Sequence, residues 1–247
     1  MIRLVVAGAL GRMGRCVIEC AARDSRFQLI AAVDQSDART LPECDVLIDF
    51  TNAAGTMEWL SECEQRRVAM VIGATGHDEK QAARIAQAAK TIPIVKAANF
   101  GVGINVLLDV IGHVAAALGP GYDIEIVETH HRNKVDAPSG TALAIAEELK
   151  RLQSRGSKGP DRLVFGRHGQ VGARPEGQIA IHAVRMGDIV GQHEVHFGGP
   201  GETMTIRHAA RSRDTFAVGA LRAAAWIVGR PPGLYTMRDV LRRQTTE

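Results

Sequence analysis

The stretch VVAGALGRMGR, residues 5–15, decides the fold of this chain. An apolar run, IRLVVA (2–7), ends at Gly8, and glycines follow at positions 11 and 14, where a helical pattern begins. A strand, a glycine-rich turn and a helix in this order are typical of dinucleotide-binding domains, because the tight turn brings backbone amides and a helix N-terminus against a pyrophosphate. The last two glycines keep the G-x-x-G spacing of that fingerprint, and the first stands one residue early.

An acidic residue supports this interpretation. A second apolar run, QLIAAV (28–33), ends at Asp34, about 20 residues after the last glycine, which is the separation the fingerprint requires. A carboxylate here would hydrogen-bond the adenosine ribose hydroxyls and repel a 2′-phosphate, which favours NADH over NADPH. Arg12 and Arg39 would partly offset this preference if either reached such a phosphate. The alternative is a glycine turn selected only for packing, with Asp34 an ordinary strand-end residue.

Strands and helices alternate through residue 99. Buried strands are predicted at 44–50, 68–76 and 92–99, and helices at 12–23, 56–67 and 78–90. This alternation predicts a doubly wound parallel sheet of the α/β class.

The pattern changes after Gly103. We predict a helix at 104–118, a strand at 122–130, a helix at 140–153 and a polar stretch at 154–177, with helices again at 214–228 and 236–243. Three alternating runs, at 178–185, 188–197 and 202–210, are joined by glycine turns and predict an antiparallel meander. The fold class is therefore α/β, with an N-terminal Rossmann-type sheet plus a smaller α+β domain whose sheet is mostly antiparallel.

Composition excludes several classes of function. The net charge is +3 and only 4% of the residues are aromatic, so no nucleic-acid partner is expected. We see no leader segment and no apolar run long enough to cross a membrane, which predicts a cytoplasmic protein with no membrane partner. The cysteines at 16, 20, 44 and 63 form no CxxC pair and have no accompanying histidine set, so no metal site is expected.

A second stretch, ETHHRNKVDAPSGTA (128–142), concentrates titratable and turn-forming residues. On a regular strand His130 and His131 would point to opposite faces, so they serve one site only if the strand ends there. Ser139 is expected to cap a helix with an apolar face that includes Ala142, Ile145, Ala146 and Leu149.

The same stretch contains the elements of an anion pocket. The amides of Gly140 and Thr141 would lie at the positive end of the helix, and Lys134 would add a full charge. Histidine titrates near neutral pH and can donate a proton. Together these features indicate reduction of a small acidic substrate, although solvated histidines beside a capped helix would give the same pattern.

The residues of this stretch, E-x-H-H-x-x-K-x-D-x-P-S-G-T-A, closely resemble the signature of the dihydrodipicolinate reductase family, also called 4-hydroxy-tetrahydrodipicolinate reductases. The resemblance covers nearly the whole chain. The other motifs are, in order, GALGRMG (8–14), DFT (49–51), GATG (73–76), AANFGVGIN (97–105), RMGDIVGQH (185–193), SRDTFAVGALRAAAW and MRDVL.

The resemblance implies an NAD(P)H-dependent oxidoreductase that reduces the cyclic product of aspartate semialdehyde and pyruvate, on the diaminopimelate–lysine pathway. It also implies a small dicarboxylate heterocycle as substrate and a homotetramer assembled through the sheet of the second domain. Residues 1–102 and 213–247 would form the dinucleotide-binding domain, and residues 103–212 the substrate-binding and oligomerisation domain.

Motif positions also imply residue roles. His130 would be the catalytic general acid, with Lys134 acting beside it, and the substrate would be bound by His131, Ser139, Gly140 and Thr141. The residues implied to bind the cofactor are Gly8, Gly11, Arg12, Met13, Gly14, Asp34, Gly73, Thr75, Ala98, Asn99, Phe100 and Arg213.

Two departures from the family pattern concern the cofactor. Family members often carry an arginine directly after the acidic residue, where this chain has Gln35, and many have a longer segment between Asp34 and residue 44. Both departures favour NADH, with NADPH use still possible.

Two rival interpretations remain. One is a two-domain amino-acid dehydrogenase of the homoserine or aspartate type, which has no need of the histidine stretch. The other is a non-catalytic NAD(H)-sensing module, which would not need the titratable residues.

Overall fold

The computed structural model describes residues 1–34, 37, 40–153 and 163–242. The chain forms two compact units: the first comprises Met1–Val102 and Arg213–Glu247, and the second comprises Gly103–Ser212. None of the described helices combines the length and the apolar character needed to cross a membrane.

The first unit is built on a six-stranded sheet in the order β11-β5-β4-β3-β1-β2. Its strands are β1 Ile2–Ala7, β2 Phe27–Val33, β3 Val46–Asp49, β4 Ala69–Ile72, β5 Pro93–Lys96 and β11 Gly233–Tyr235. Every adjacent pair is parallel, which confirms the predicted doubly wound sheet. The edge strand β11 comes from the C-terminal segment and was not predicted.

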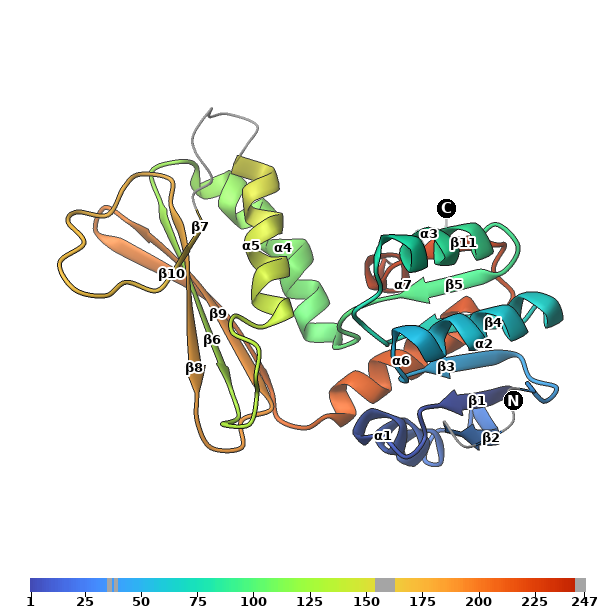
Figure 1. Ribbon diagram of the computed structural model, residues 1–247. Helices are drawn as coiled ribbons and strands as arrows, with labels where there is room; N and C mark the ends of the chain where they lie inside the picture. Colours follow the sequence, from blue (N-terminus) through green and yellow to red (C-terminus); the bar gives the residue numbers. More distant parts are fainter. Residues whose placement is uncertain (35–36, 38–39, 154–162, 243–247) are drawn as a thin grey trace. The chain divides into compact units, whose positions relative to one another are not determined.

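Helices cover both faces of this sheet (Figure 1). On one face α1 (Arg12–Ala21), α6 (Asp214–Ile227) and α7 (Met237–Leu241) pack against side chains such as Val6, and on the other α2 (Ala53–Arg66) and α3 (Glu79–Ala88) pack against its neighbour Val5. Both faces are buried, so the strands read as continuous apolar runs.

The strand order places the glycine turn at a switch point. The chain pairs β2 with one side of β1 and then crosses to pair β3 with the other. Ligands of doubly wound folds bind beyond the carboxyl ends of the strands at such a point, because the connecting helices diverge there and leave a crevice. The residues that follow β1, β2 and β3 therefore frame the candidate cofactor site.

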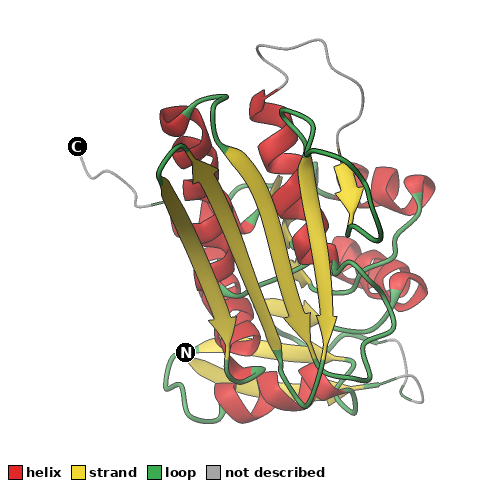
Figure 2. Cartoon of the chain, turned by 90° about the vertical axis from the view of Figure 1, so that its left-hand side faces the viewer, coloured by secondary structure: helices red, strands yellow, loops and turns green. Residues whose placement is uncertain are grey.

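The second unit is a five-stranded sheet in the order β10-β9-β6-β8-β7 with two helices on one face. Its elements are α4 Val102–Leu118, β6 Asp123–His130, α5 Gly140–Gln153, β7 Leu163–Phe165, β8 Ile179–Arg185, β9 Gly191–Gly199 and β10 Glu202–Ala210. Figure 2 shows the face of this sheet that no described helix covers.

The predicted meander is wrong. Only β9 and β10 form an antiparallel hairpin, whereas β6 lies between β8 and β9, parallel to the first and antiparallel to the second. Alternating runs identify strands but not their neighbours, and the most central position goes to the earlier strand β6. Residues 186–190 therefore cross the end of β6, where Met186 N donates to His130 O at 2.9 Å and Arg132 N to Gly187 O at 3.2 Å.

Candidate active site

The backbone of the turn after β1 is packed so closely that it leaves no space for a side chain at Gly8 or Gly14. A Cβ on Gly14 would lie 2.1 Å from Gly8 O, and one on Gly8, whose φ is +81°, would lie 2.7 Å from Phe50 O. Gly11 is the N-cap of α1, and its amide donates to Gly8 O at 3.0 Å. Arg12 and Met13 begin α1, the first exposed and the second half-buried. This cradle of bare backbone at a helix N-terminus fits a pyrophosphate.

Asp34 lies at the same turn. Its Oδ2 accepts a hydrogen bond from Leu10 N at 2.7 Å, and its own amide donates to Asp37 Oδ2 at 2.6 Å. The carboxylate therefore lies beside the glycine turn, where the ribose of a bound dinucleotide is held in this fold. Gln35 and Arg39, which bear on the choice between NADH and NADPH, lie outside the described residues.

The other predicted cofactor residues follow β4 and β5 or begin α6. Gly73 donates its amide to Asp49 O at 2.8 Å, and Thr75 and Ala98 are exposed. The Asn99 side chain accepts from the Gly101 amide at 2.9 Å, and Arg213 is the half-buried N-cap of α6.

Phe100 is a core residue. It is 1% exposed, and its ring meets that of Phe50 edge-on at 5.9 Å between centroids. A Cβ on Gly73 would also reach the Phe50 ring. These aromatic contacts shape the loops after β4 and β5 and bury the whole of Phe100, so this predicted cofactor residue is not exposed to a ligand in the structure.

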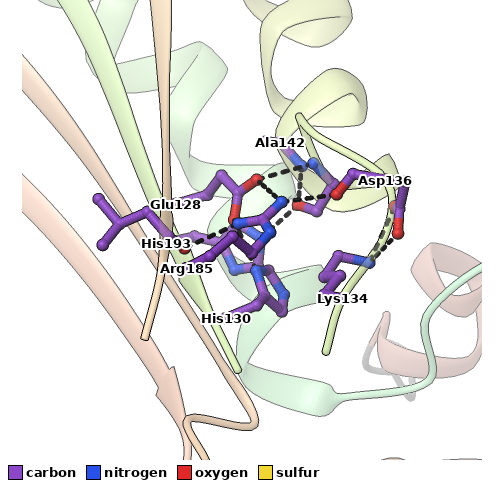
Figure 3. A network of polar contacts seen from close by, with 9 residues as sticks. Glu128, His130, Lys134, Asp136, Ala142, Arg185 and His193 are labelled. Atoms are coloured by element: carbon purple, nitrogen blue, oxygen red, sulfur yellow. Dashed lines mark hydrogen bonds and ion pairs between the residues drawn. The ribbon is translucent and has the colours of Figure 1, made fainter. Parts of the chain in front are cut away.

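In the second unit a buried carboxylate organises the histidine stretch (Figure 3). β6 alternates buried and half-buried residues, so Glu128 and His130 share its helix-covered face. Glu128 Oε2 lies 2.6 Å from His130 Nδ1, and Glu128 Oε1 accepts from Ser139 N at 2.9 Å. One carboxylate thus connects the predicted general acid to the turn that begins α5.

Arg185, at the end of β8, completes this network. It is the register partner of His130, and its guanidinium donates to both Glu128 oxygens, at 2.8 and 2.7 Å. The same side chain donates to Asp136 O at 2.6 Å. Burial alone would raise the pKa of Glu128, but hydrogen bonds from His130, Arg185 and the Ser139 amide outweigh it and hold that pKa at about 2.

Ser139 caps α5, as the sequence predicted. Its Oγ accepts from Ala142 N at 3.2 Å, and the predicted apolar face of the helix is fully buried. The Ser139 hydroxyl also lies 3.1 Å from Nε2 of His193, a buried residue on β9 whose ring meets that of His130 edge-on. Burial, and next the charge of His130, lower the pKa of His193 to about 3, so this ring is neutral at physiological pH.

The remaining predicted residues lie on the loop between β6 and α5. Lys134 Nζ contacts both Asp136 oxygens, at 2.7 and 2.8 Å, and Figure 3 shows Lys134 and His130 extending to the same side of the Glu128 network. β6 ends at His130, and His131 is half-buried in the turn. Gly140 opens α5, and a Cβ there would meet nothing within 4 Å, which leaves open space at the helix N-terminus.

Three residues of this site were missed from the sequence. Glu128 stood in the quoted stretch without a role, and Arg185 and His193 stood in the motif RMGDIVGQH. The alternation of β6 offered one signal, because residues two apart on a strand share a face. Nothing local connected Arg185 and His193 to His130, since that contact depends on the strand order.

The network predicts acid lability. In the unfolded chain His193 takes up a proton near pH 6.5 and Glu128 near 4.5, whereas their folded pKa values are about 3 and about 2. Each group therefore contributes stability above its unfolded pKa. That contribution is lost as the pH falls from the unfolded pKa to the folded pKa, which is from 6.5 to about 3 for His193 and from 4.5 to about 2 for Glu128. We expect the free energy of unfolding to fall from pH 7 to pH 5, with His193 contributing up to about 1.4 kcal/mol per pH unit.

Urea unfolding of the wild type and a His193→Gln variant at pH 7 and pH 5 measures this contribution. The variant should show a shallower pH dependence, because the residue that protonates only in the unfolded state is gone. An identical slope in both proteins would contradict the assignment of His193 as a buried neutral group.

Comparisons with known proteins agree over the full length. A family model described as "Dihydrodipicolinate reductase, N-terminus" matches residues 2–100, and one described as "Dihydrodipicolinate reductase, C-terminus" matches residues 103–241. The 4-hydroxy-tetrahydrodipicolinate reductase of Akkermansia muciniphila is 45% identical with 98% of both chains covered, and that of Myxococcus xanthus is 41% identical with 100% of both covered.

A solved structure is also similar. A dipicolinate-bound dihydrodipicolinate reductase from Paenisporosarcina sp. TG-14 superposes with a TM-score of 0.78 at 28% identity, covering 98% of this chain and 100% of its own.

Proposed function

Because this chain belongs to the dihydrodipicolinate reductase family, we propose that His130, Lys134 and the N-terminus of α5 form its active site. The chain is an NAD(P)H-dependent oxidoreductase that reduces 4-hydroxy-tetrahydrodipicolinate in diaminopimelate and lysine biosynthesis. Neither rival interpretation is favoured. The observation that carries the proposed site is the Glu128 carboxylate, which joins His130 and the start of α5.

In this site His130 supplies the proton. Once the 4-hydroxyl has left the substrate as water, a bound nicotinamide would supply a hydride to the conjugated ring, and the electron pair that this leaves on the ring would take up a proton. With Nδ1 against Glu128, Nε2 of a protonated His130 is the atom that gives its proton to that ring. The neutral imidazole is then reprotonated from water, and proton donation by a positioned group contributes roughly 10²–10⁴ in rate.

The two substrate carboxylates are held by separate parts of one loop. The amides of Gly140 and Thr141, at the positive end of α5, bind one carboxylate, with Ser139 fixing the turn. Lys134 binds the other by exchanging its contact with Asp136 for the substrate. His131 lies in the same turn, where its carbonyl oxygen accepts a hydrogen bond from Lys134 N at 3.1 Å. A dicarboxylate is thereby oriented before the reaction begins.

The first unit holds the cofactor in this proposal, and the second holds the substrate. The glycine turn would bind the pyrophosphate and Asp34 the adenosine ribose. The nicotinamide would be bound by the loops that contain Gly73, Thr75, Ala98 and Asn99, and Arg213 begins α6 where the chain returns to the first unit. A carboxylate at the ribose favours NADH, and NADPH remains a secondary cofactor.

Replacing Asp34 by alanine should therefore lower kcat/KM for NADH by about tenfold while that for NADPH is unchanged or rises, because the loss of the ribose hydrogen bonds affects NADH and the loss of repulsion favours NADPH. Paired kinetics with the two cofactors measure the ratio. Asp24→Ala, which removes a carboxylate from the turn before β2, is the matched control and should leave the ratio unchanged. A ratio unaffected by Asp34→Ala would remove this residue from the cofactor site.

We also propose a homotetramer that packs through the uncovered face of the second sheet. On that face Glu125 of β6 pairs with Arg167 at 2.8 Å and with His182 at 2.7 Å. Light scattering should give four times the 26.5 kDa of one chain, and a monomer would contradict the proposal.

We also propose the cytoplasm as the compartment of this protein. Its four cysteines are free thiols, which agrees with a reducing environment.

The reaction is tested by a coupled assay. The purified protein, the upstream synthase, aspartate semialdehyde and pyruvate are mixed, and NADH consumption is followed by absorbance. We expect oxidation that requires both the synthase and this protein. If oxidation does not depend on the synthase, the protein acts on another substrate.

A further inference from the structure

Glu128 has the environment of a residue that positions a catalytic group. Its side chain is fully buried, and its two oxygens receive four contacts, from His130 Nδ1, both terminal nitrogens of Arg185 and the Ser139 amide. Burying a carboxylate is costly unless every lone pair is used. At the base of the proposed active site, hydrogen bonds from groups on β6, β8 and the α5 turn offset this cost.

The charge state of Glu128 determines which nitrogen of His130 carries a proton. Arg185 and the other donors keep the carboxylate ionised, and an ionised carboxylate only accepts hydrogen bonds. Nδ1 of His130 must therefore keep its hydrogen in both charge states, and Nε2 is the nitrogen that loses and regains a proton. A neutral carboxyl or a hydrogen-bond donor at position 128 would permit the other tautomer. In that tautomer Nε2 keeps its hydrogen, and Nδ1 is the nitrogen that loses and regains a proton.

The other charged groups around His130 leave this relationship intact. His193 faces His130 from β9 as a neutral ring, and His208, its register partner on β10, is also kept neutral because burial lowers its pKa. Lys134 and Asp136, on the loop, form their own ion pair. Glu128 is thus the anion in contact with the imidazole among the described residues.

Gly191 supports the same geometry. A Cβ on this glycine, at the start of β9, would lie 3.0 Å from His130 Nε2 and 3.3 Å from Cδ2. The absence of a side chain at 191 therefore leaves room beside the nitrogen that the Glu128 contact assigns to proton transfer.

We propose that Glu128, held by Arg185, is the positioning residue of the reaction: it fixes the His130 tautomer so that Nε2 delivers the proton, and it holds the α5 amides in register with that nitrogen. The inference rests on the proposed function. Glu128 acts through His130 and the Ser139 amide and does not itself contact substrate.

The test is a Glu128→Gln variant assayed from pH 5 to pH 9. We expect kcat to fall about 10²-fold or more, with the KM for NADH unchanged. The midpoint of the kcat–pH profile should differ from that of the wild type, because the proposed proton donor loses the carboxylate that contacts its Nδ1. A merely structural role would lower activity without moving this midpoint, and that result would overturn the proposal.

Glu125→Gln is the matched control. Glu125 lies three residues earlier on β6, on the opposite face, and has its own partners in Arg167, Arg174 and His182. Its pKa is likewise lowered to about 2, with burial opposed by those hydrogen bonds. The control should keep the wild-type pH midpoint, and an equal shift in both variants would contradict a specific action of Glu128.

A spectroscopic measurement on the wild type needs no variant to fold. With ¹⁵N-labelled histidine, long-range ¹H–¹⁵N spectra above pH 8 should show His130 protonated on Nδ1 and bare at Nε2. The opposite tautomer would overturn the inference. Because this experiment uses no substrate, it can fail while the coupled assay succeeds, and the assay can fail while the tautomer is as expected.

Discussion

Replacing His130 by glutamine should lower kcat by about 10²–10⁴ while the affinity for NADH stays at the wild-type level. Glutamine can keep a contact with Glu128, so the buried carboxylate retains a partner, but it cannot donate a proton and recover it at neutral pH. The expected loss therefore lies in the chemical step. Steady-state kinetics in the coupled assay give kcat, and fluorescence titration gives the NADH dissociation constant.

The control for this variant is His113→Gln. His113 is an exposed histidine on α4 of the same unit, so its replacement should leave both quantities unchanged. A parallel loss of NADH binding in the His130 variant would move this residue from proton transfer to cofactor binding. An unchanged kcat would remove it from the reaction.

Lys134→Ala should lower kcat/KM for the substrate by about 10²–10³, because a charge-assisted contact with a carboxylate is lost. The variant also leaves Asp136 without its cation at 2.7 Å, so an acidic group remains where the substrate's negative charge should lie. Most of this loss should appear as a higher KM for the substrate, because Lys134 binds it. Any decrease in kcat would measure how far Lys134 also aligns the ring with His130.

Lys150→Ala is the matched control for the charge. Lys150 lies on α5 and forms an ion pair with Glu147 at 3.5 Å, so its loss removes one positive charge from the same unit without changing the loop after β6. We expect wild-type kinetics from it. Equal losses in the two lysine variants would indicate a general electrostatic effect, and an unchanged kcat/KM in Lys134→Ala would exclude this residue from the site.

Much of the fold followed from local patterns in the sequence. Gly8, Gly11 and Gly14 predicted the turn after β1 because its backbone approaches too closely for any side chain. Ser139 predicted the start of α5, because a hydroxyl there satisfies an amide that the helix cannot. These predictions held because each depends on residues near one another in the chain.

The arrangement of the second sheet did not follow from local patterns. The runs that become β8 and β9 read as neighbours, yet β6 pairs with both, and this choice depends on packing against α4 and α5. The same long-range choice brings Arg185 and His193 to His130. For that reason His130, the proposed general acid, was recognisable in the sequence, whereas the residues that contact its side chain were visible only in the structure.

In the proposed active site, His130, Lys134 and the first amides of α5 converge on one dicarboxylate. A crystal structure of this protein with NADH and dipicolinate tests it most directly. We expect one carboxylate on the Gly140 and Thr141 amides, the other on Lys134 Nζ, and the ring facing His130 Nε2. Dipicolinate bound away from these groups, or contacting only one of them, would contradict it.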